Sequence, residues 1–140
     1  MAAPTEILVI EDDTLDRELI AELLTVRGRG RIRVSEALDF KSAMEKLASQ
    51  SFDLVLLDTR LPDATALYAL RAIGEQAPLT PVLPHPAYIT AKARQWARER
   101  GAFDVVVRGD LNPMWSAINK LLTLAALGHD DRPIARAVGE

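Results

Sequence analysis

Two short apolar runs in this sequence each end in acidic side chains. Residues 7–10 are followed by three acids at positions 11–13, and residues 54–57 are followed by Asp58. If both runs are buried parallel strands, their carboxyl ends lie side by side, at the edge where open α/β sheets bind ligands. Carboxylates held close together repel one another, so such a cluster usually holds a cation. We therefore expect a hard divalent cation between the acids of the two runs.

The apolar pattern of the whole sequence predicts five strand–helix units. Each short apolar run is followed by a segment whose apolar residues recur at helical spacing. This alternation is typical of a doubly wound α/β fold, in which a mostly parallel sheet has helices on both faces. Thr14, Asp39 and Asn112 are the expected N-caps of the first, second and last helices. The predicted strands are 7–10, 32–34, 52–57, 79–83 and 103–107. The first predicted helix runs from residue 14 to an end within 27–30, and the third runs from the turn at 61–63 to residue 74. The other predicted helices are 39–50, 90–100 and 112 to about 127.

Composition and charge limit the classes of function. The 140 residues, 49% of them apolar, suffice for one domain with a full core, which we assign to residues 1–127. Residues 128–140 lose periodicity and are expected to form a flexible tail or the start of a linker. The net charge of −3 favours neither nucleic acid nor a membrane as partner, and a cytoplasmic location is expected because a basic start and a long apolar run are both missing. There is no cysteine and the two histidines match no metal-ligand spacing, which excludes thiol nucleophiles and zinc sites of those types.

A set of motifs resembles the receiver domain of bacterial two-component response regulators. The set comprises the acid pair Glu11-Asp12, the strand-end Asp58, a Leu61-Pro62-Asp63 turn and a Gly101-Ala102 pair before the last predicted strand. The resemblance extends from residue 6 to about residue 127. It implies a flavodoxin-like fold, with a five-stranded parallel sheet of order 2-1-3-4-5 flanked by five helices. It also implies a histidine kinase or a phosphotransfer protein as partner and Mg²⁺ as cofactor.

The resemblance assigns roles to four residues. Asp58 is the implied phosphoacceptor, Asp12 a direct Mg²⁺ ligand, Glu11 its support through water, and the backbone carbonyl of Arg60 a further ligand. The residue types suit this chemistry, because a carboxylate that attacks phosphorus is repelled by the phosphoryl oxygens, and Mg²⁺ binds carboxylate and phosphoryl oxygens together. The alternative is that these acids are helix N-terminal charges favoured by the macrodipole, and for Asp13 this is the preferred interpretation.

Several positions depart from the pattern of the resembled family. Pro86 stands where a Ser or Thr hydroxyl usually holds the phosphoryl group, and proline cannot donate a hydrogen bond. Arg108-Gly109 replaces the usual Lys-Pro, so Arg108 either contacts the phosphate in place of lysine or forms an ion pair with the acid cluster. Val105 replaces the aromatic residue that moves upon activation, and Ala66 replaces a glycine after the acceptor turn. The usual switch is therefore not expected to operate.

Two functions remain open on the sequence alone. One is an atypical receiver in a two-component phosphorelay, phosphorylated on Asp58 with Mg²⁺ and signalling through protein contacts. The other is a pseudo-receiver, a protein-interaction module that does not depend on phosphorylation. Neither is an enzyme beyond self-phosphorylation and self-dephosphorylation, because no cysteine, paired histidine or extra general acid accompanies Asp58. The fourth helix, fifth strand and last helix form the expected surface for a homodimer or an effector, with Trp115 assigned to the core.

Overall fold

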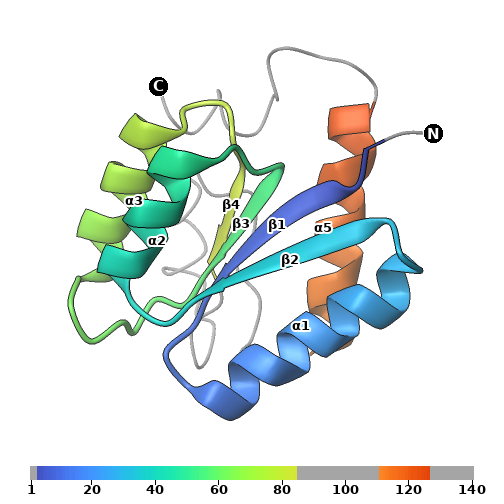
Figure 1. The fold of residues 1–140 in the computed structure, drawn as a ribbon, viewed down its shortest axis with the longest axis horizontal. Helices are drawn as coiled ribbons and strands as arrows, with labels where there is room; N and C mark the ends of the chain where they lie inside the picture. Colours follow the sequence, from blue (N-terminus) through green and yellow to red (C-terminus); the bar gives the residue numbers. More distant parts are fainter. Residues whose placement is uncertain (1–2, 85–110, 127–140) are drawn as a thin grey trace.

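The computed structural model describes residues 3–84 and 111–126, whose strands form a four-stranded parallel sheet in the order β2-β1-β3-β4 (Figure 1). This confirms the predicted α/β architecture, and the predicted strand order as far as the described residues extend. The predicted helix 90–100 and strand 103–107 lie outside them. In chain order the elements are β1 (Thr5–Ile10), α1 (Thr14–Gly28), β2 (Ile32–Ala37), α2 (Phe40–Ser49), β3 (Leu54–Leu57), α3 (Ala66–Gln76), β4 (Val82–Pro84) and α5 (Leu111–Ala126).

The sheet is the middle of three layers. Helices α1 and α5 lie on one face, and α2 and α3 lie on the other (Figure 1). Each face has its own cluster of buried apolar side chains, and β1 contributes to both because successive residues of a strand point to opposite faces. Ile7 and Val9 pack with α1 and α5, whereas Leu8 and Ile10 pack with α2 and α3. Burial on both faces explains why β1 and β3 read as continuous apolar runs.

The start of α1 differs from the prediction by one residue. Asp13, not Thr14, is the N-cap, and its side chain accepts a hydrogen bond of 2.9 Å from the Asp16 backbone N–H. Both residue types cap helices, but Asp13 has the extended backbone of an N-cap, with φ −77° and ψ 119°. The preferred interpretation of Asp13 as a helix N-terminal charge is therefore confirmed, and its carboxylate serves α1.

The end of α1 lies within the predicted segment 27–30, but an arginine there, and not a glycine, takes the left-handed conformation that ends the helix. Arg29 takes the left-handed conformation usual for glycine at a helix end, with φ 50°. Gly28 is needed for space, because a Cβ at this position would lie 2.8 Å from the Ile32 side chain. The absence of a side chain at residue 28 thus lets β2 pack closely against the end of α1.

All four described strands have different bounds from those predicted. β1 begins at Thr5 rather than at residue 7, and β3 begins at Leu54 rather than at residue 52. β2 continues to Ala37, so that it pairs with the whole of β1, from Thr5 opposite Ile32 to Ile10 opposite Ala37. β4 begins at Val82 rather than at residue 79, since the Thr80 backbone N–H bonds to the Ala77 carbonyl and closes a turn there. The sheet therefore extends furthest along β1 and β2 and is short at β4.

Two helices also differ at their ends. α3 continues through Gly74 to Gln76, because one exposed helical glycine costs only about 1 kcal/mol and the next turn closes with its own hydrogen bonds. α5 begins at Leu111, which places the predicted cap Asn112 inside the helix. Trp115 is half-buried and packs against the core cluster of α1 and α5, as predicted. Among the helices of the described segments, none has the length and apolar character needed to cross a bilayer.

Candidate functional site

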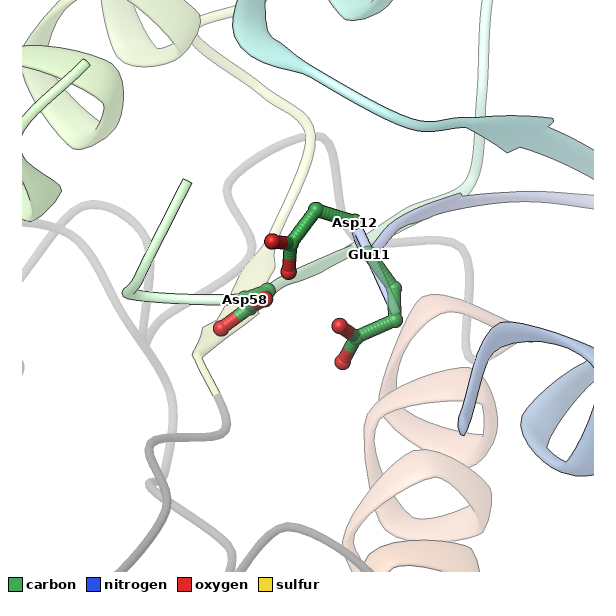
Figure 2. Close-up of side chains that lie close together, drawn as sticks. All are labelled: Glu11, Asp12 and Asp58. Carbon is green, nitrogen blue, oxygen red and sulfur yellow. The ribbon is translucent and has the colours of Figure 1, made fainter. Parts of the chain in front are cut away.

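Three carboxylates converge at the carboxyl end of the sheet. Glu11, Asp12 and Asp58 each offer one oxygen, and these oxygens all lie within 4.8 Å of one another (Figure 2). Glu11 and Asp58 are completely buried, whereas Asp12 is exposed. The convergence expected from the two acid-ended apolar runs is therefore present in the structure.

Continuation of the strand pairing beyond the strands brings these acids together. The Asp58 backbone N–H donates to the Ile10 carbonyl at 2.9 Å, and the Glu11 backbone N–H donates to the Ala37 carbonyl at 3.0 Å. Asp58 is thereby fixed beside the end of β1, and Glu11 beside the end of β2. Three strands hold the backbone from which the carboxylates extend, so the site is built on rigid elements and not on loops alone.

Local hydrogen bonds orient two of the carboxylates. The Asp13 backbone N–H donates to Glu11 Oε2 at 3.0 Å, and the Arg60 backbone N–H donates to Asp58 Oδ1 at 2.9 Å. In each case the donor lies two residues after the acid, in the turn that leaves the strand. These turns bring backbone N–H groups to buried negative charge, which lowers the cost of burying it.

Arg17 supports the acid pair from α1, a role that the sequence analysis missed. Its Nη1 donates to the backbone carbonyl of Glu11 at 2.8 Å, and its Nε lies 3.2 Å from a carboxylate oxygen of Glu36 on β2. The only signal in the sequence is the spacing of four residues between Asp13 and Arg17, which places an acid and an arginine on one side of a helix. This spacing does not reveal a bond to a backbone carbonyl.

Asp63 links the turn after Asp58 to α2, which the sequence analysis also missed. Its two carboxylate oxygens accept hydrogen bonds from the backbone N–H groups of Phe40, at 2.8 Å, and Lys41, at 3.0 Å. The first N–H groups of a helix have no partner within it, so a carboxylate there is favoured by hydrogen bonding and by the helix dipole. The Phe40 ring also meets the Tyr68 ring edge to face, with centroids 5.4 Å apart. The segment between the predicted acceptor and α3 is thus attached to α2.

Asp39 shows how a carboxylate at the same end of the sheet is satisfied without joining the cluster. As predicted, it caps α2: its side chain accepts from the Ser42 backbone N–H at 2.8 Å, while the Ser42 hydroxyl accepts from the Asp39 backbone N–H at 3.3 Å. Hydrogen bonding with the Ser42 side chain, and to a smaller extent with the Ser42 backbone, lowers the pKa of Asp39 below its ordinary value. Its charge therefore serves the helix end.

Comparison with known proteins identifies the family. The sequence profile described as the response regulator receiver domain matches residues 7–118 of this chain. The chain belongs to this family. This chain is 33% identical over 135 residues to the response regulator protein PilR of Pseudomonas aeruginosa, and the match covers 95% of this chain and 30% of PilR. It is 31% identical over 118 residues to the transcriptional regulatory protein ZraR of Escherichia coli, covering 84% of this chain and 26% of that protein.

The solved structures give the same result. The crystal structure of the response regulator protein TrrA from Thermotoga maritima, in complex with Mg²⁺-BeF, superposes with a TM-score of 0.73 at 25% identity, covering 84% of this chain and 98% of the chain in that structure. The receiver domain spans less than a third of the length of the curated relatives named above, so only this part of those proteins is comparable.

The donor set of the receiver domain fits Mg²⁺. All three converging groups are carboxylates, and Mg²⁺ is bound in proteins by one or two carboxylates with the remaining positions taken by water or phosphate oxygens. Two of the three side chains are completely buried, which makes their mutual repulsion costly without a cation. Within residues 3–84 and 111–126, no nitrogen or sulfur ligand takes part in this cluster, so its chemistry favours a hard cation over zinc or copper.

The remaining predicted positions divide into two groups. Pro86, Val105, Arg108 and Gly109 lie outside the described residues, so their roles stay predictions. Ala66 is the first residue of α3, directly after Thr65, whose side chain accepts a hydrogen bond of 3.2 Å from the Tyr68 backbone N–H and caps the helix. The replacement of glycine by alanine at this position is therefore compatible with a well-capped α3.

Proposed function

We propose that this receiver domain accepts a phosphoryl group on Asp58 with Mg²⁺ bound, and that it acts in a two-component phosphorelay. The observation that carries the proposal is the convergence of Glu11, Asp12 and Asp58 within 4.8 Å at the carboxyl end of the sheet. In the proposal Asp12 is a direct Mg²⁺ ligand, Glu11 supports the ion through water, and Asp58 and the Arg60 carbonyl complete the protein ligands. The phosphoryl donor is a histidine kinase or a phosphotransfer protein.

The proposed transfer forms one bond and breaks one. A carboxylate oxygen of Asp58 forms a bond to phosphorus while the bond from phosphorus to the donor nitrogen breaks, and the electron pair of that bond leaves with the nitrogen. Mg²⁺ when bound supplies the positive charge that offsets repulsion between the attacking carboxylate and the phosphoryl oxygens. The Arg60 backbone N–H donates to Asp58 Oδ1 at 2.9 Å and thereby helps to orient the carboxylate.

The domain is proposed to be an atypical receiver. Arg108 is proposed to contact the phosphoryl group in place of lysine, since a guanidinium can form two parallel hydrogen bonds to phosphate. Pro86 and Val105 lack the hydroxyl and the aromatic ring of the usual switch, so signalling would proceed through protein contacts by another route. Residues 1–127 are proposed to form the receiver unit, followed by a tail or linker.

One observation favours a second candidate, a pseudo-receiver that binds a protein partner regardless of phosphorylation. By the resemblance described above, Pro86 and Val105 stand at the positions of the two side chains by which a typical receiver senses its phosphoryl group. In this case the acid cluster would survive as a structural cation site or without function. The two candidates differ in one measurable property, the formation of a phosphoryl adduct on Asp58.

The test is to incubate the protein with a small phosphodonor and Mg²⁺ and to measure its mass. We expect an adduct of one phosphoryl group in the natural chain and none in Asp58→Asn. Asp53→Asn is the matched control, because Asp53 is a half-buried aspartate of the same domain that binds the Glu6 backbone N–H, at 2.8 Å, at the opposite end of the sheet. An adduct that persists in Asp58→Asn, or its absence from the natural chain together with no Mg²⁺ affinity, would favour the pseudo-receiver.

A further inference from the structure

The guanidinium of Arg17 joins three parts of the chain near the acid cluster. It donates from Nη1 to the Glu11 carbonyl at 2.8 Å, and its Nε lies 3.2 Å from a carboxylate oxygen of Glu36, while Arg17 itself belongs to α1. The Arg17 side chain is only 17% exposed, and that of Glu36 is 44% exposed. A partly buried arginine with two fixed partners has little rotational freedom left, so it can hold the groups that it contacts.

The Glu11 backbone is linked to the end of β2 both directly and through Arg17. The Glu11 N–H donates to the Ala37 carbonyl at 3.0 Å, and the Glu11 carbonyl accepts from Arg17, which is itself paired with Glu36, the residue before Ala37. Both backbone polar groups of Glu11 are therefore anchored to the end of β2, one directly and one through the guanidinium. The peptide unit before Glu11 is held by the Ala37 carbonyl, and the peptide unit between Glu11 and Asp12 is held at its carbonyl by Arg17.

We propose that Arg17 is a positioning residue for the Mg²⁺ site, an inference that rests on the proposed function. Glu11 and Asp12 extend from the two ends of the peptide unit that Arg17 holds. Mg²⁺ requires near-ideal octahedral geometry, so a small rotation of that unit would displace a ligand. Groups that orient metal ligands without touching the metal typically change its affinity by 10–100-fold when they are removed.

The sign of the effect separates positioning from simple charge. A positive charge near a cation site repels the cation, so removal of Arg17 should strengthen Mg²⁺ binding if its charge were its only influence. Loss of positioning has the opposite result, because the carboxylates would no longer be aimed at one point. Weaker binding on removal of a positive charge is therefore specific to the positioning role.

The chain offers a matched control in Arg33. Arg33 also forms an ion pair of 3.2 Å, with Glu6, but this pair joins β2 to β1 at the opposite end of the sheet and the Arg33 side chain is 67% exposed. Arg17→Met and Arg33→Met change the net charge equally and keep an unbranched apolar side chain. They differ in whether the lost guanidinium contacts the acid pair.

The experiment is calorimetric titration of Mg²⁺ alone into the metal-free natural chain and its variants. We expect Arg17→Met to weaken binding about tenfold, Arg17→Lys to weaken it less because one donor and the charge remain, and Arg33→Met to leave it unchanged. Glu36→Gln, which frees one side of the guanidinium, should weaken binding in the same direction as Arg17→Met but by less. Circular dichroism establishes that each variant is folded, and if Arg17→Met is not, Arg17→Lys, which keeps the charge, carries the test.

Two outcomes would overturn the inference. If the natural chain binds Mg²⁺ and the Arg17 variants bind it equally well or more tightly, Arg17 is not a positioning residue and the proposed function stands. If the natural chain binds no Mg²⁺, the proposed function fails and the role of Arg17 fails with it. The two failures are distinguished by the titration of the natural chain.

Discussion

The acidic residues at the two ends of the sheet differ in their partners. At the end where the strands begin, Glu6 pairs with Arg33 at 3.2 Å, and the Asp53 carboxylate accepts the Glu6 backbone N–H at 2.8 Å. At the end where the strands finish, Glu11, Asp12 and Asp58 converge on one another within 4.8 Å. Separated acids with their own donors help to register the strands. Converging acids oppose folding through their repulsion, which the proposed Mg²⁺ would offset.

The largest expected difference between the two ends is their response to Mg²⁺. Mg²⁺ should raise the Tm of the natural chain, because a ligand that binds only the folded state adds about 2.7 kcal/mol of stability at a concentration of 100 times its Kd. Asp58→Asn should abolish this increase while raising metal-free stability, since one of three converging charges is removed. Glu6→Gln, at the other end, should retain the full increase. Thermal unfolding with and without Mg²⁺ measures both, and an unchanged Mg²⁺ response in Asp58→Asn would contradict the assignment of the two ends.

The next largest effect is expected where β2 begins. Gly28→Ala should destabilise the fold by roughly 1–3 kcal/mol, because its Cβ would lie 2.8 Å from the Ile32 side chain. Gly74→Ala is the matched control: this helical glycine has open space around it, so alanine there should stabilise by about 0.5–1 kcal/mol. Urea unfolding gives both values. Mg²⁺ affinity should be unaffected by either change, and a loss of affinity in Gly28→Ala would show that the two ends are coupled.

A smaller effect is expected from the ion pair between Glu6 and Arg33. The Arg33 side chain is 67% exposed, and exposed ion pairs usually contribute about 0.2–1 kcal/mol. A double-mutant cycle with Glu6→Gln and Arg33→Met should give a coupling energy in that range, reduced by added salt. A coupling well above it would mean that the start of the sheet depends on charge pairing more than its exposure indicates.

The smallest effect concerns pH and Asp39. Hydrogen bonds from Ser42 lower the pKa of Asp39 in the folded state. The stability that they contribute is therefore fully present above the ordinary aspartate pKa of about 3.9 and is lost as the pH falls through the lowered folded-state value. An NMR titration should find the Asp39 pKa below its ordinary value, and Ser42→Ala should move it back toward that value. An unchanged pKa in Ser42→Ala would leave the backbone hydrogen bond as the sole cause.

The parts of the site that depend on strand order could be predicted from the sequence. The parts that depend on side chains reaching from one element to another could not. Apolar runs ending in acid were sufficient to predict that Asp12 and Asp58 approach each other, because parallel neighbours end at the same edge. The bonds from Arg17 to the Glu11 carbonyl and from the start of α2 to Asp63 involve backbone groups, which carry no residue-specific signal. The spacing of apolar residues therefore does not predict these hydrogen bonds.

The prediction of element bounds failed where two residues compete for one role. Asp13 and Thr14 are both good N-caps, and only the backbone conformation decides between them. Gly74 resembled a helix end, but the helix passes through it because the residues that follow continue its hydrogen bonding. Local residue types give the existence of an element more reliably than its last turn.

The division of β1 between two cores has a consequence for the acid cluster. Ile7 and Val9 fill one core while Leu8 and Ile10 fill the other. A shift of β1 by one residue along its neighbours would exchange these two sets and empty both cores of their fitted side chains. The same shift would carry the acid pair away from Asp58. Packing of apolar side chains in the two cores thus determines how far apart the carboxylates lie at the carboxyl end of the sheet. A core variant that loosens the alignment of β1 should therefore change Mg²⁺ affinity without altering any acidic residue.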